Sequence, residues 1–357
     1  MKMTARYIPL FIYLVFPFFL FAQTDNLPTT KEFLAPSDAI IFGPEQPLVL
    51  DVALDMKSIF RKKNDEDYLN AIMRIRSTGG EVTRSVGVKA RGDFRRSYCA
   101  IPPLKIKLKN ADFGYEAWDT VASLKLVTTC KSSDIFEDYL MKEYLAYKMY
   151  SALTPRSFMV RLVQITFKDI NGKYDDVEQM GFLIEDIDDL AKRNQAFELE
   201  PEVMSISWAD RHQALQMILF QYAIGNTDWH VGNLHNLKVI KTDDPARSLS
   251  YLIPYDFDFS GLVNAPYAIP DPELMIPDVQ TRVFQGSCYS DVEIMICIHE
   301  ILAVKDIWMQ EISASPWLSA NSKRASLDYM KAFFDLIEND RAVDATFFMN
   351  CYTSQND

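Results

Sequence analysis

Glycine is scarce in this chain, which has only 12 glycines among 357 residues. This scarcity excludes collagen-like and other glycine-repeat folds, and no repeat with a period of about 20–50 residues indicates a solenoid or a propeller. No G-x-G-x-x-G loop is present either. With 48% hydrophobic and 24% charged residues, the composition is that of an ordinary folded protein of one large domain or two.

Positive charge is also in short supply. Lysine and arginine number 37 against 49 aspartates and glutamates, so the formal net charge is −12 at pH 7. A general nucleic-acid-binding protein needs a cationic surface to displace counterions from phosphates, and this balance excludes that class. It does not exclude ATP, because a divalent metal ion can neutralise the phosphates at an acidic site.

Cysteines are few and are not spaced as metal ligands. The five cysteines include no C-x-x-C pair and lie at Cys99, Cys130, Cys288, Cys297 and Cys351. In an exported protein we expect one or two disulfides, and we predict a bond between Cys99 and Cys130. Cys297 falls in an apolar helical stretch, where we expect a buried thiol.

A hydrophobic run stands at the N-terminus, where Lys2 and Arg6 precede an apolar stretch from Ile8 to Ala22. A charged start, a short apolar run and a small final residue are typical of a secretory signal peptide, whereas a membrane span needs about 20 apolar residues. We therefore predict a signal peptide over residues 1–22 and no stable membrane span after its cleavage. The expected location is the periplasm, the cell envelope or the extracellular space.

The first half of the chain alternates between apolar and polar residues, as half-buried β-strands do. Strands are predicted over residues 47–54, 71–76, 82–91, 104–108, 123–128, 159–167 and 180–184. Turns at Gly79-Gly80 and Asn171-Gly172 predict hairpins. One helix interrupts the strands, and we expect it to start with a capping box at Asp134 and Glu137.

The second half is predicted to be mostly helical. Helices are expected over residues 208–224, 291–312 and 322–337, the first of them stopping at Gly225. Two short strands are expected over residues 237–240 and 251–254. A β-rich half followed by a helical half favours two lobes with a cleft between them.

Two polar loops in the second half carry the residues best suited to catalysis. The loops contain Asp228, Asn233, Asn236, Asp256 and Asp258. Phosphoryl transfer needs a carboxylate that orients or deprotonates the attacking hydroxyl, and an Asn and an Asp that hold the metal ion. Asp228 and Asn233 have the D-x-x-x-x-N spacing of protein kinases, and Asp256 follows a strand as their metal-binding Asp does. Asn236, directly before the strand at 237, is an alternative to Asn233.

The same residues support other interpretations. Asp and Asn in loops often only cap backbone groups. The segment that starts at Asp256 resembles an EF-hand loop, but Tyr267 stands where that loop needs its Glu. His230 and His235 would be metal ligands if the protein were a metal-dependent phosphoesterase that also used Asp228 and Asp256.

Basic residues gather in segment 91–109, where the turn RGDFRR precedes the strand PPLKIKLK. Such an arrangement can contact phosphates. Lys105 or Lys107 would then take the place of the third-strand Lys of a kinase, with Glu143 or Glu137 as its ionic partner. The alternative is a solvated strand face that carries lysines.

These motifs resemble those of the spore-coat protein H (CotH) kinases, a family of secreted or coat-associated atypical kinases. VGVKARGDFRR at 86–96 is similar to the family's strand that ends in a basic RG turn, although that turn more often reads RGNSSR. GFLIEDIDDLAKR at 181–193 resembles the segment that ends the family's hairpin. NTDWHVGNLHN at 226–236 and IPYDFDFSG at 253–261 resemble its catalytic and metal loops.

The resemblance implies an α+β fold of the two-lobed protein-kinase type. The β-rich N-terminal lobe would span 23–186, and a mainly helical C-terminal lobe would span 187–357. It also implies ATP with Mg²⁺ or Mn²⁺ and transfer of the γ-phosphoryl group to Ser or Thr of an exported protein. A catalytically inactive relative that serves as a binding or scaffold protein of the cell envelope is the alternative.

Carried over residue by residue, the resemblance makes Asp228 the catalytic residue. The metal ligands would be Asp256, Asn233 or Asn236, and Asp258. The nucleotide would be contacted or positioned by Lys107 or Lys105, Arg91, Glu143 and Glu185. Glu185 would lie near the adenine, at the junction between the lobes.

Overall fold

The structure is a computed structural model that describes residues 34–43, 46–61, 67–92, 94–244, 249–286 and 288–348. The signal peptide predicted over residues 1–22 lies outside this part of the chain, and so does Cys351. The strands are β1 (Leu48–Leu54), β2 (Leu69–Ser77), β3 (Gly80–Ala90), β4 (Leu104–Lys107), β5 (Ser123–Thr128), β6 (Val160–Asp169), β7 (Val177–Ile184), β8 (Ala196–Leu199), β9 (Leu237–Thr242) and β10 (Ser250–Pro254). The α-helices are α1 (Met56–Arg61), α2 (Phe94–Tyr98), α3 (Glu116–Asp119), α4 (Asp134–Leu153), α5 (Ile187–Arg193), α6 (Arg211–Ile224), α7 (Asp291–Ala303), α8 (Lys305–Ala314), α9 (Ala320–Ile337) and α10 (Asp340–Val343).

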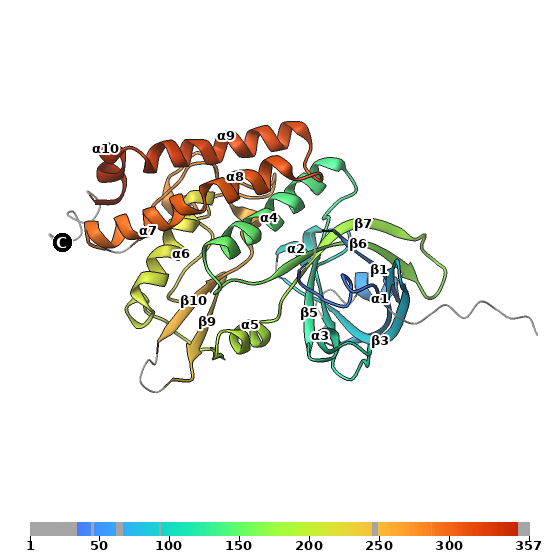
Figure 1. The fold of residues 1–357 in the computed structure, drawn as a ribbon. Helices are drawn as coiled ribbons and strands as arrows, with labels where there is room; N and C mark the ends of the chain where they lie inside the picture. The colour runs from blue at the N-terminus through green and yellow to red at the C-terminus, as the bar shows by residue number, and fades with distance from the viewer. Residues whose placement is uncertain are drawn as a thin grey trace, which may run out of the picture.

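Seven strands close into a barrel in the order β1-β2-β3-β4-β5-β7-β6, seen on the right of Figure 1. Neighbouring strands are antiparallel except β1 and β6, which run parallel from the Leu48–Val163 pair to the Leu54–Asp169 pair. Because side chains along a strand point alternately to its two faces, every second side chain points into the barrel. Val52, for example, is fully buried there. Closure pairs both sides of each of these strands, so none of the seven is an edge.

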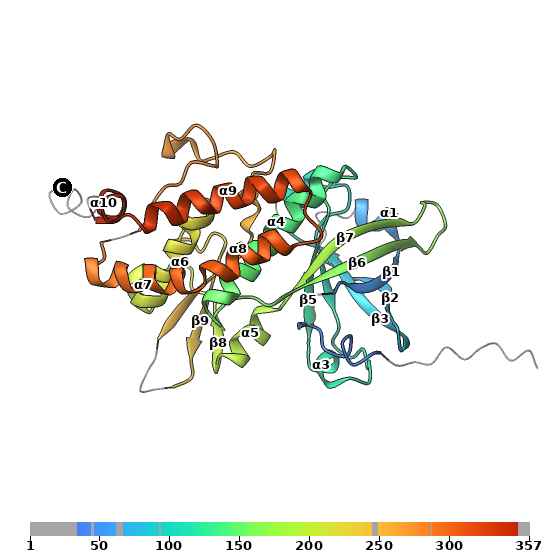
Figure 2. The same ribbon diagram turned by 45° about the horizontal axis from the view of Figure 1, so that its top comes forward.

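The second half packs helices around a separate core. Helices α6, α7, α8 and α9 lie together on the side away from the barrel, and both views show α8 and α9 next to α4 (Figures 1 and 2). An antiparallel sheet, β10-β9-β8, lies beneath α6. The core of this half and the core inside the barrel are separate clusters of buried side chains.

Helix α4 packs between the outer face of the barrel and the helices of the second half, and its buried side chains belong to the core of that half. On one side the ring of Tyr144 lies 5.9 Å from that of Phe182 on β7. On the other side the Trp308 Nε1 of α8 donates a hydrogen bond of 2.8 Å to the Met149 carbonyl. The buried Asp138 accepts a hydrogen bond of 2.8 Å from the Ser319 backbone amide at the start of α9. Helix α4 therefore contacts the barrel strand β7 on one side and α8 and α9 on the other.

The two-lobed protein-kinase fold that the resemblance implied is wrong in both halves. The β-rich half is a closed mixed barrel, and the half expected to be mainly helical carries a sheet of its own. Alternation of apolar and polar residues shows which face of a strand is buried but not which strands are neighbours, so the parallel pairing of β1 with β6 left no local signal. Strand β8 was missed because four residues, AFEL, give too little alternation to detect.

Two further details of the helices differ from expectation. The helix predicted over 291–312 is two helices, α7 and α8, which meet at Val304. The residue before α4 is Ser133, and it makes no side-chain cap hydrogen bond, so the capping box expected at Asp134 is wrong. Within the part of the chain that the structure describes, none of the helices combines the length and apolar character that a bilayer crossing requires.

The predicted disulfide between Cys99 and Cys130 is confirmed. It ties the residue after α2 to the segment between β5 and α4. The prediction of a buried thiol at Cys297 is also confirmed.

Candidate functional site

Helix α6 positions the first polar loop through the way it ends. Gly225 caps the helix in the left-handed conformation with φ of 64°, and a Cβ there would collide with the Tyr329 hydroxyl. The next residue, Asn226, is buried and binds back to the helix through the Gln221 side chain at 3.1 Å. The Asn226 Oδ1 then accepts a hydrogen bond of 3.0 Å from the Asp228 amide. The backbone of Asp228 is thus fixed by a buried amide side chain.

The Asp228 carboxylate is held by two side chains of the same loop. Its Oδ1 lies 2.9 Å from His235 Nε2, and its Oδ2 accepts a 2.9 Å hydrogen bond from Asn236 Nδ2. Asn236 also donates to the Asp228 carbonyl at 2.7 Å. Asn236 therefore touches Asp228, whereas the Asn233 Oδ1 accepts from the His235 amide at 3.2 Å.

The second polar loop is joined to the first through the backbone. The Tyr255 amide donates a hydrogen bond of 3.1 Å to the Asn236 carbonyl. Asn236 and Asp256 both have positive φ, at 51° and 63°, a conformation that costs free energy in residues other than glycine. The Asp256 amide donates a hydrogen bond of 2.9 Å to the Tyr147 hydroxyl of α4. Strained backbone of this kind gathers at functional sites.

Three carboxylates from α4 and the second loop form an acidic cluster. Glu143, Asp256 and Asp258 each offer an oxygen within 4.8 Å of the others. Glu143 and Asp258 are almost completely buried, at 0% and 3% exposure. Burial raises the pKa of both and Asp256 raises it further, and together they outweigh the lowering by the nearby charge of Arg95.

Arg95 supplies the positive charge of this cluster. Its guanidinium lies 2.5 Å from Glu143 Oε2 and 2.8 Å from Asp258 Oδ2. Burial acts to lower the pKa of Arg95, but Asp258 and Glu143 outweigh it and raise that pKa well above its ordinary value. Arg95 comes from α2, in the RGDFRR turn, so this turn reaches the acidic cluster directly.

The acidic cluster is suited to a divalent cation. Glu143 Oε1 is buried and has no hydrogen-bond partner, although its other oxygen binds Arg95. An unpartnered buried carboxylate oxygen is costly unless a cation or a proton satisfies it. Carboxylate oxygens are the ligands that Mg²⁺ and Mn²⁺ prefer. The residues present therefore fit the metal ion that the resemblance implies.

A cavity of about 590 Å³ is lined by residues of both polar loops and of the basic turn. Its lining includes Arg91, Arg95, Asp228, Asn233, His235, Asn236, Tyr255, Asp256 and Asp258. A neighbouring cavity of about 440 Å³ shares Asp228, Asn233 and His235 and extends to Asp271 and Glu273. Asp228 thus lines both cavities, and the larger one is also lined by Asp256 and Asp258 of the acidic cluster.

The predicted nucleotide residues are only partly brought together. Arg91 lines the larger cavity. Lys105 instead forms an ion pair of 3.3 Å with Asp186, and the exposed Lys107 points over the Tyr68 ring at 5.4 Å. Glu143 is in the acidic cluster, but its partner is Arg95 rather than either lysine.

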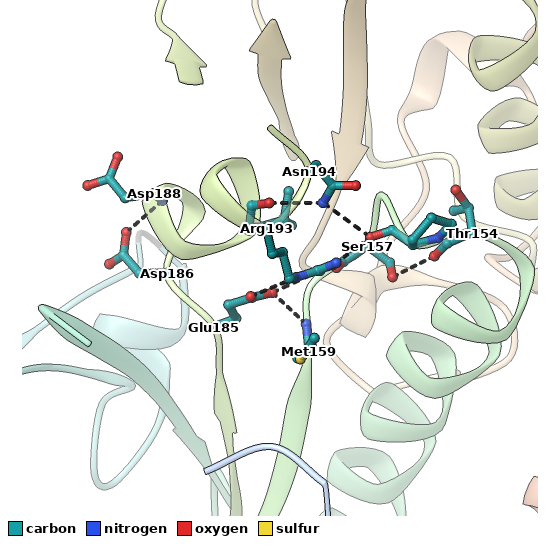
Figure 3. A network of polar contacts seen from close by, with 10 residues as sticks. Thr154, Ser157, Met159, Glu185, Asp186, Asp188, Arg193 and Asn194 are labelled. Carbon is teal, nitrogen blue, oxygen red and sulfur yellow. Dashed lines mark hydrogen bonds and ion pairs between the residues drawn. The ribbon is translucent and has the colours of Figure 1, made fainter. Parts of the chain in front are cut away.

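Glu185 lies at the junction between β7 and α5, where it is engaged by protein groups (Figure 3). Its carboxylate binds the Arg193 guanidinium at 2.8 Å and accepts from the Met159 amide at 3.0 Å. Its backbone amide donates to the Met159 carbonyl at 2.9 Å. Figure 3 shows this network extending to Asn194 and Ser157, so the Glu185 side chain is a structural link of the junction.

Two basic residues near the site, Arg95 and Lys125, were not predicted from the sequence. Arg95 belongs to the same basic turn as Arg91, which the resemblance places at the nucleotide, and the spacing gives no means of choosing between the two. Lys125 lies on β5, opposite Lys105, with its ammonium 4.9 Å from the Phe158 ring and 5.6 Å from the Tyr255 ring. Burial, with help from the charge of Arg91, lowers the pKa of Lys125 to about 7. A single lysine in an apolar strand carried no signal of this environment.

Comparison with known proteins does not assign the chain to a family. No family model matches the chain, and none of the curated proteins searched matches it.

Proposed function

We propose that this protein is a phosphotransferase that moves the γ-phosphoryl group of ATP to a Ser or Thr hydroxyl of an exported protein. One observation carries the proposal: Asp228, Asp256 and Asp258 line the same cavity of about 590 Å³. A candidate base and candidate metal ligands in one cavity are the parts that phosphoryl transfer needs, because this reaction relies on positioning and charge stabilisation.

Each group has a role in this proposal. Asp228, kept in place by Asn236 and His235, would orient the acceptor hydroxyl and take its proton. Asp256, Asp258 and Glu143 would hold Mg²⁺ or Mn²⁺, which when bound neutralises charge on the phosphates. Arg91, on the cavity wall, would bind phosphate oxygens.

The smaller cavity offers a place for the acceptor. It begins at Asp228 and is lined farther out by the exposed Asp271 and Glu273. Carboxylates at this position favour an acceptor segment that carries Lys or Arg near the target hydroxyl. We therefore propose a basic acceptor, without nucleic acid as a substrate.

Export is supported by the disulfide between Cys99 and Cys130, since such bonds persist in oxidising compartments. The phosphoesterase alternative has less support. In the described residues, the two groups of three that could hold a metal do not include His230 or His235. The inactive scaffold stays an alternative that only an assay excludes.

The test is transfer of label from ATP labelled at the γ-phosphate to a basic protein, with Mg²⁺ or Mn²⁺. The proposal expects label on protein, reduced about 10²–10⁴-fold in Asp228→Asn. Asp243→Asn, an exposed carboxylate away from the cavity, is the matched control and should keep full transfer. Equal transfer by Asp228→Asn and the control would contradict the assignment. ATP binding without transfer to any acceptor would favour the scaffold, and phosphate release from a phosphomonoester without ATP would favour the phosphoesterase.

A further inference from the structure

A second group of metal-binding side chains lies away from the cleft, between α6 and α7. His212 on α6 and Cys297 and Glu300 on α7 offer a nitrogen, a sulfur and a carboxylate oxygen within 4.8 Å of one another. The Cys297 Sγ is 3.6 Å from His212 Nδ1, and His212 Nε2 is 3.1 Å from Glu300 Oε1. Cys297 and Glu300 are three residues apart, so both face α6 from one side of their helix.

The donor set, and the spacing of its cysteine and histidine, match zinc. Thiolate and imidazole ligands favour Zn²⁺ over Mg²⁺ or Ca²⁺, which take oxygen ligands. With Zn–S near 2.3 Å and Zn–N near 2.0–2.1 Å, two ligands of a tetrahedral ion lie about 3.5 Å apart. The separation of 3.6 Å between Cys297 Sγ and His212 Nδ1 agrees with this value.

The surroundings of the three side chains also suit a bound ion. Gln216, one turn after His212 and buried, donates from Nε2 to Glu300 Oε2 at 2.9 Å. Outer hydrogen bonds of this kind orient the ligands of metal sites. The thiol of Cys297 is buried, while the His212 side chain is 50% exposed and that of Glu300 38% exposed. An ion can therefore enter from solvent and keep a water as its fourth ligand.

We propose that Cys297 Sγ, His212 Nδ1 and the Glu300 carboxylate bind one Zn²⁺ that cross-links α6 to α7, with Glu300 giving up its contact to His212 Nε2 to reach the ion. On binding, the thiol loses its proton to solvent and the sulfur becomes a thiolate ligand. This site is independent of the acidic cluster, which contains oxygen ligands alone.

Titration with Co²⁺ tests the site separately from the acidic cluster, because a cobalt–thiolate pair has a charge-transfer absorption that oxygen ligands lack. The parent protein for this experiment carries Cys351→Ser, so that Cys288 and Cys297 are its thiols outside the disulfide. We expect one equivalent of Co²⁺ to produce the band and one equivalent of Zn²⁺ to remove it. Zn²⁺ should also raise the melting temperature, since it binds the folded state.

The variants decide which residues are ligands. Cys297→Ser should abolish the band, and His212→Ala, at a half-exposed position that tolerates truncation, should weaken cobalt binding by at least about tenfold. The matched controls are His299→Ala, which changes an exposed histidine of α7, and Cys288→Ser. Both should keep the band. No thiolate band in the parent, or a band that survives Cys297→Ser or is unchanged by His212→Ala, would overturn the proposal.

Discussion

Arg95 and Glu143 form an ion pair of 2.5 Å, although 48 residues separate them along the chain. The carboxylate is fully buried, and the guanidinium side chain is 11% exposed. Arg95 also binds Asp258, so one cation joins α2, α4 and the second polar loop. The kinase resemblance paired Glu143 with a lysine of β4, and here an arginine of the preceding turn makes that contact.

Removal of the Arg95 charge should destabilise the fold strongly. Arg95→Met leaves Glu143 and Asp258 buried without their cation, and breaking a buried pair in this way costs about 3–5 kcal/mol. Denaturant unfolding of the parent and the variant measures the loss. Arg324→Met, at an exposed position of α9, should change the free energy of unfolding by less than about 0.5 kcal/mol. A similarly small change in Arg95→Met would show that the cluster does not depend on this cation.

The disulfide should stabilise the segment that carries Arg95. Cys99 and Cys130 are 31 residues apart, and closing a loop of this length is worth about 3–4 kcal/mol in the chain-entropy model. We expect Cys99→Ser/Cys130→Ser to lower the free energy of unfolding by that amount. The measurement is denaturant unfolding with and without a reductant. Reductant should destabilise the parent and leave the double variant unchanged, and an equal response of both proteins would contradict the prediction.

Local patterns predicted the elements of this fold better than their arrangement. The strand over 123–128 and the end of α6 at Gly225 were found because alternation and the left-handed glycine are properties of neighbouring residues. The parallel contact of β1 with β6 depends on residues more than one hundred positions apart. No local rule encodes that contact, so barrel closure was missed.

In the candidate site, too, local patterns predicted individual residues but not the contacts between them. Spacing within each polar loop pointed to Asp228 and Asp256, which line one cavity. The choice between Asn233 and Asn236 could not be made from spacing, because spacing does not show backbone conformation. In the structure Asn236 has a positive φ, and its side chain contacts Asp228. Arg95 was missed for a related reason, since only the packing of α2 against α4 and the second loop selects it from a basic turn.

Asn236 should matter more than His235 for the proposed transfer. Asn236 is buried and binds both the carbonyl and the carboxylate of Asp228, whereas the His235 side chain is 53% exposed and makes one contact with that carboxylate. We expect Asn236→Ala to lower phosphoryl transfer by at least about 10²-fold, and His235→Ala by about tenfold or less. Steady-state transfer rates, with circular dichroism to verify folding, measure both. A larger loss in His235→Ala would instead favour the phosphoesterase interpretation.

Charge on the wall of the smaller cavity should affect the affinity for a basic acceptor. Asp271→Asn/Glu273→Gln removes two carboxylates from its outer wall, and Asn at 271 still accepts the hydrogen bond that Asp271 receives from the Glu273 amide. We expect KM for a basic acceptor peptide to rise by about tenfold while kcat and KM for ATP stay the same. Added salt should raise KM in the parent and have less effect on the variant. If KM for basic and neutral peptides rose equally, the proposed preference for a basic acceptor would be wrong.

Lys125 should give the protein a measurable dependence of stability on pH. Burial lowers the pKa of its ammonium in the folded protein from an ordinary 10.5 to about 7. Between these values the unfolded chain holds a proton that the folded protein lacks, so the free energy of unfolding rises with pH across this window. The slope is at most about 1.4 kcal/mol per pH unit, and part of the side chain reaches solvent, which reduces it.

Replacement of Lys125 by an apolar residue isolates this effect. The Lys125→Met variant should be more stable than the parent near pH 7, and its advantage should shrink by about 2 kcal/mol or less as the pH rises to 10. Denaturant unfolding at several pH values measures the difference. Lys107→Met, on the exposed face of β4, controls for the loss of one positive charge. A difference between parent and Lys125→Met that stays constant from pH 7 to 10 would show that Lys125 keeps its proton in the folded protein, held by Asp186 and the two aromatic rings despite its burial.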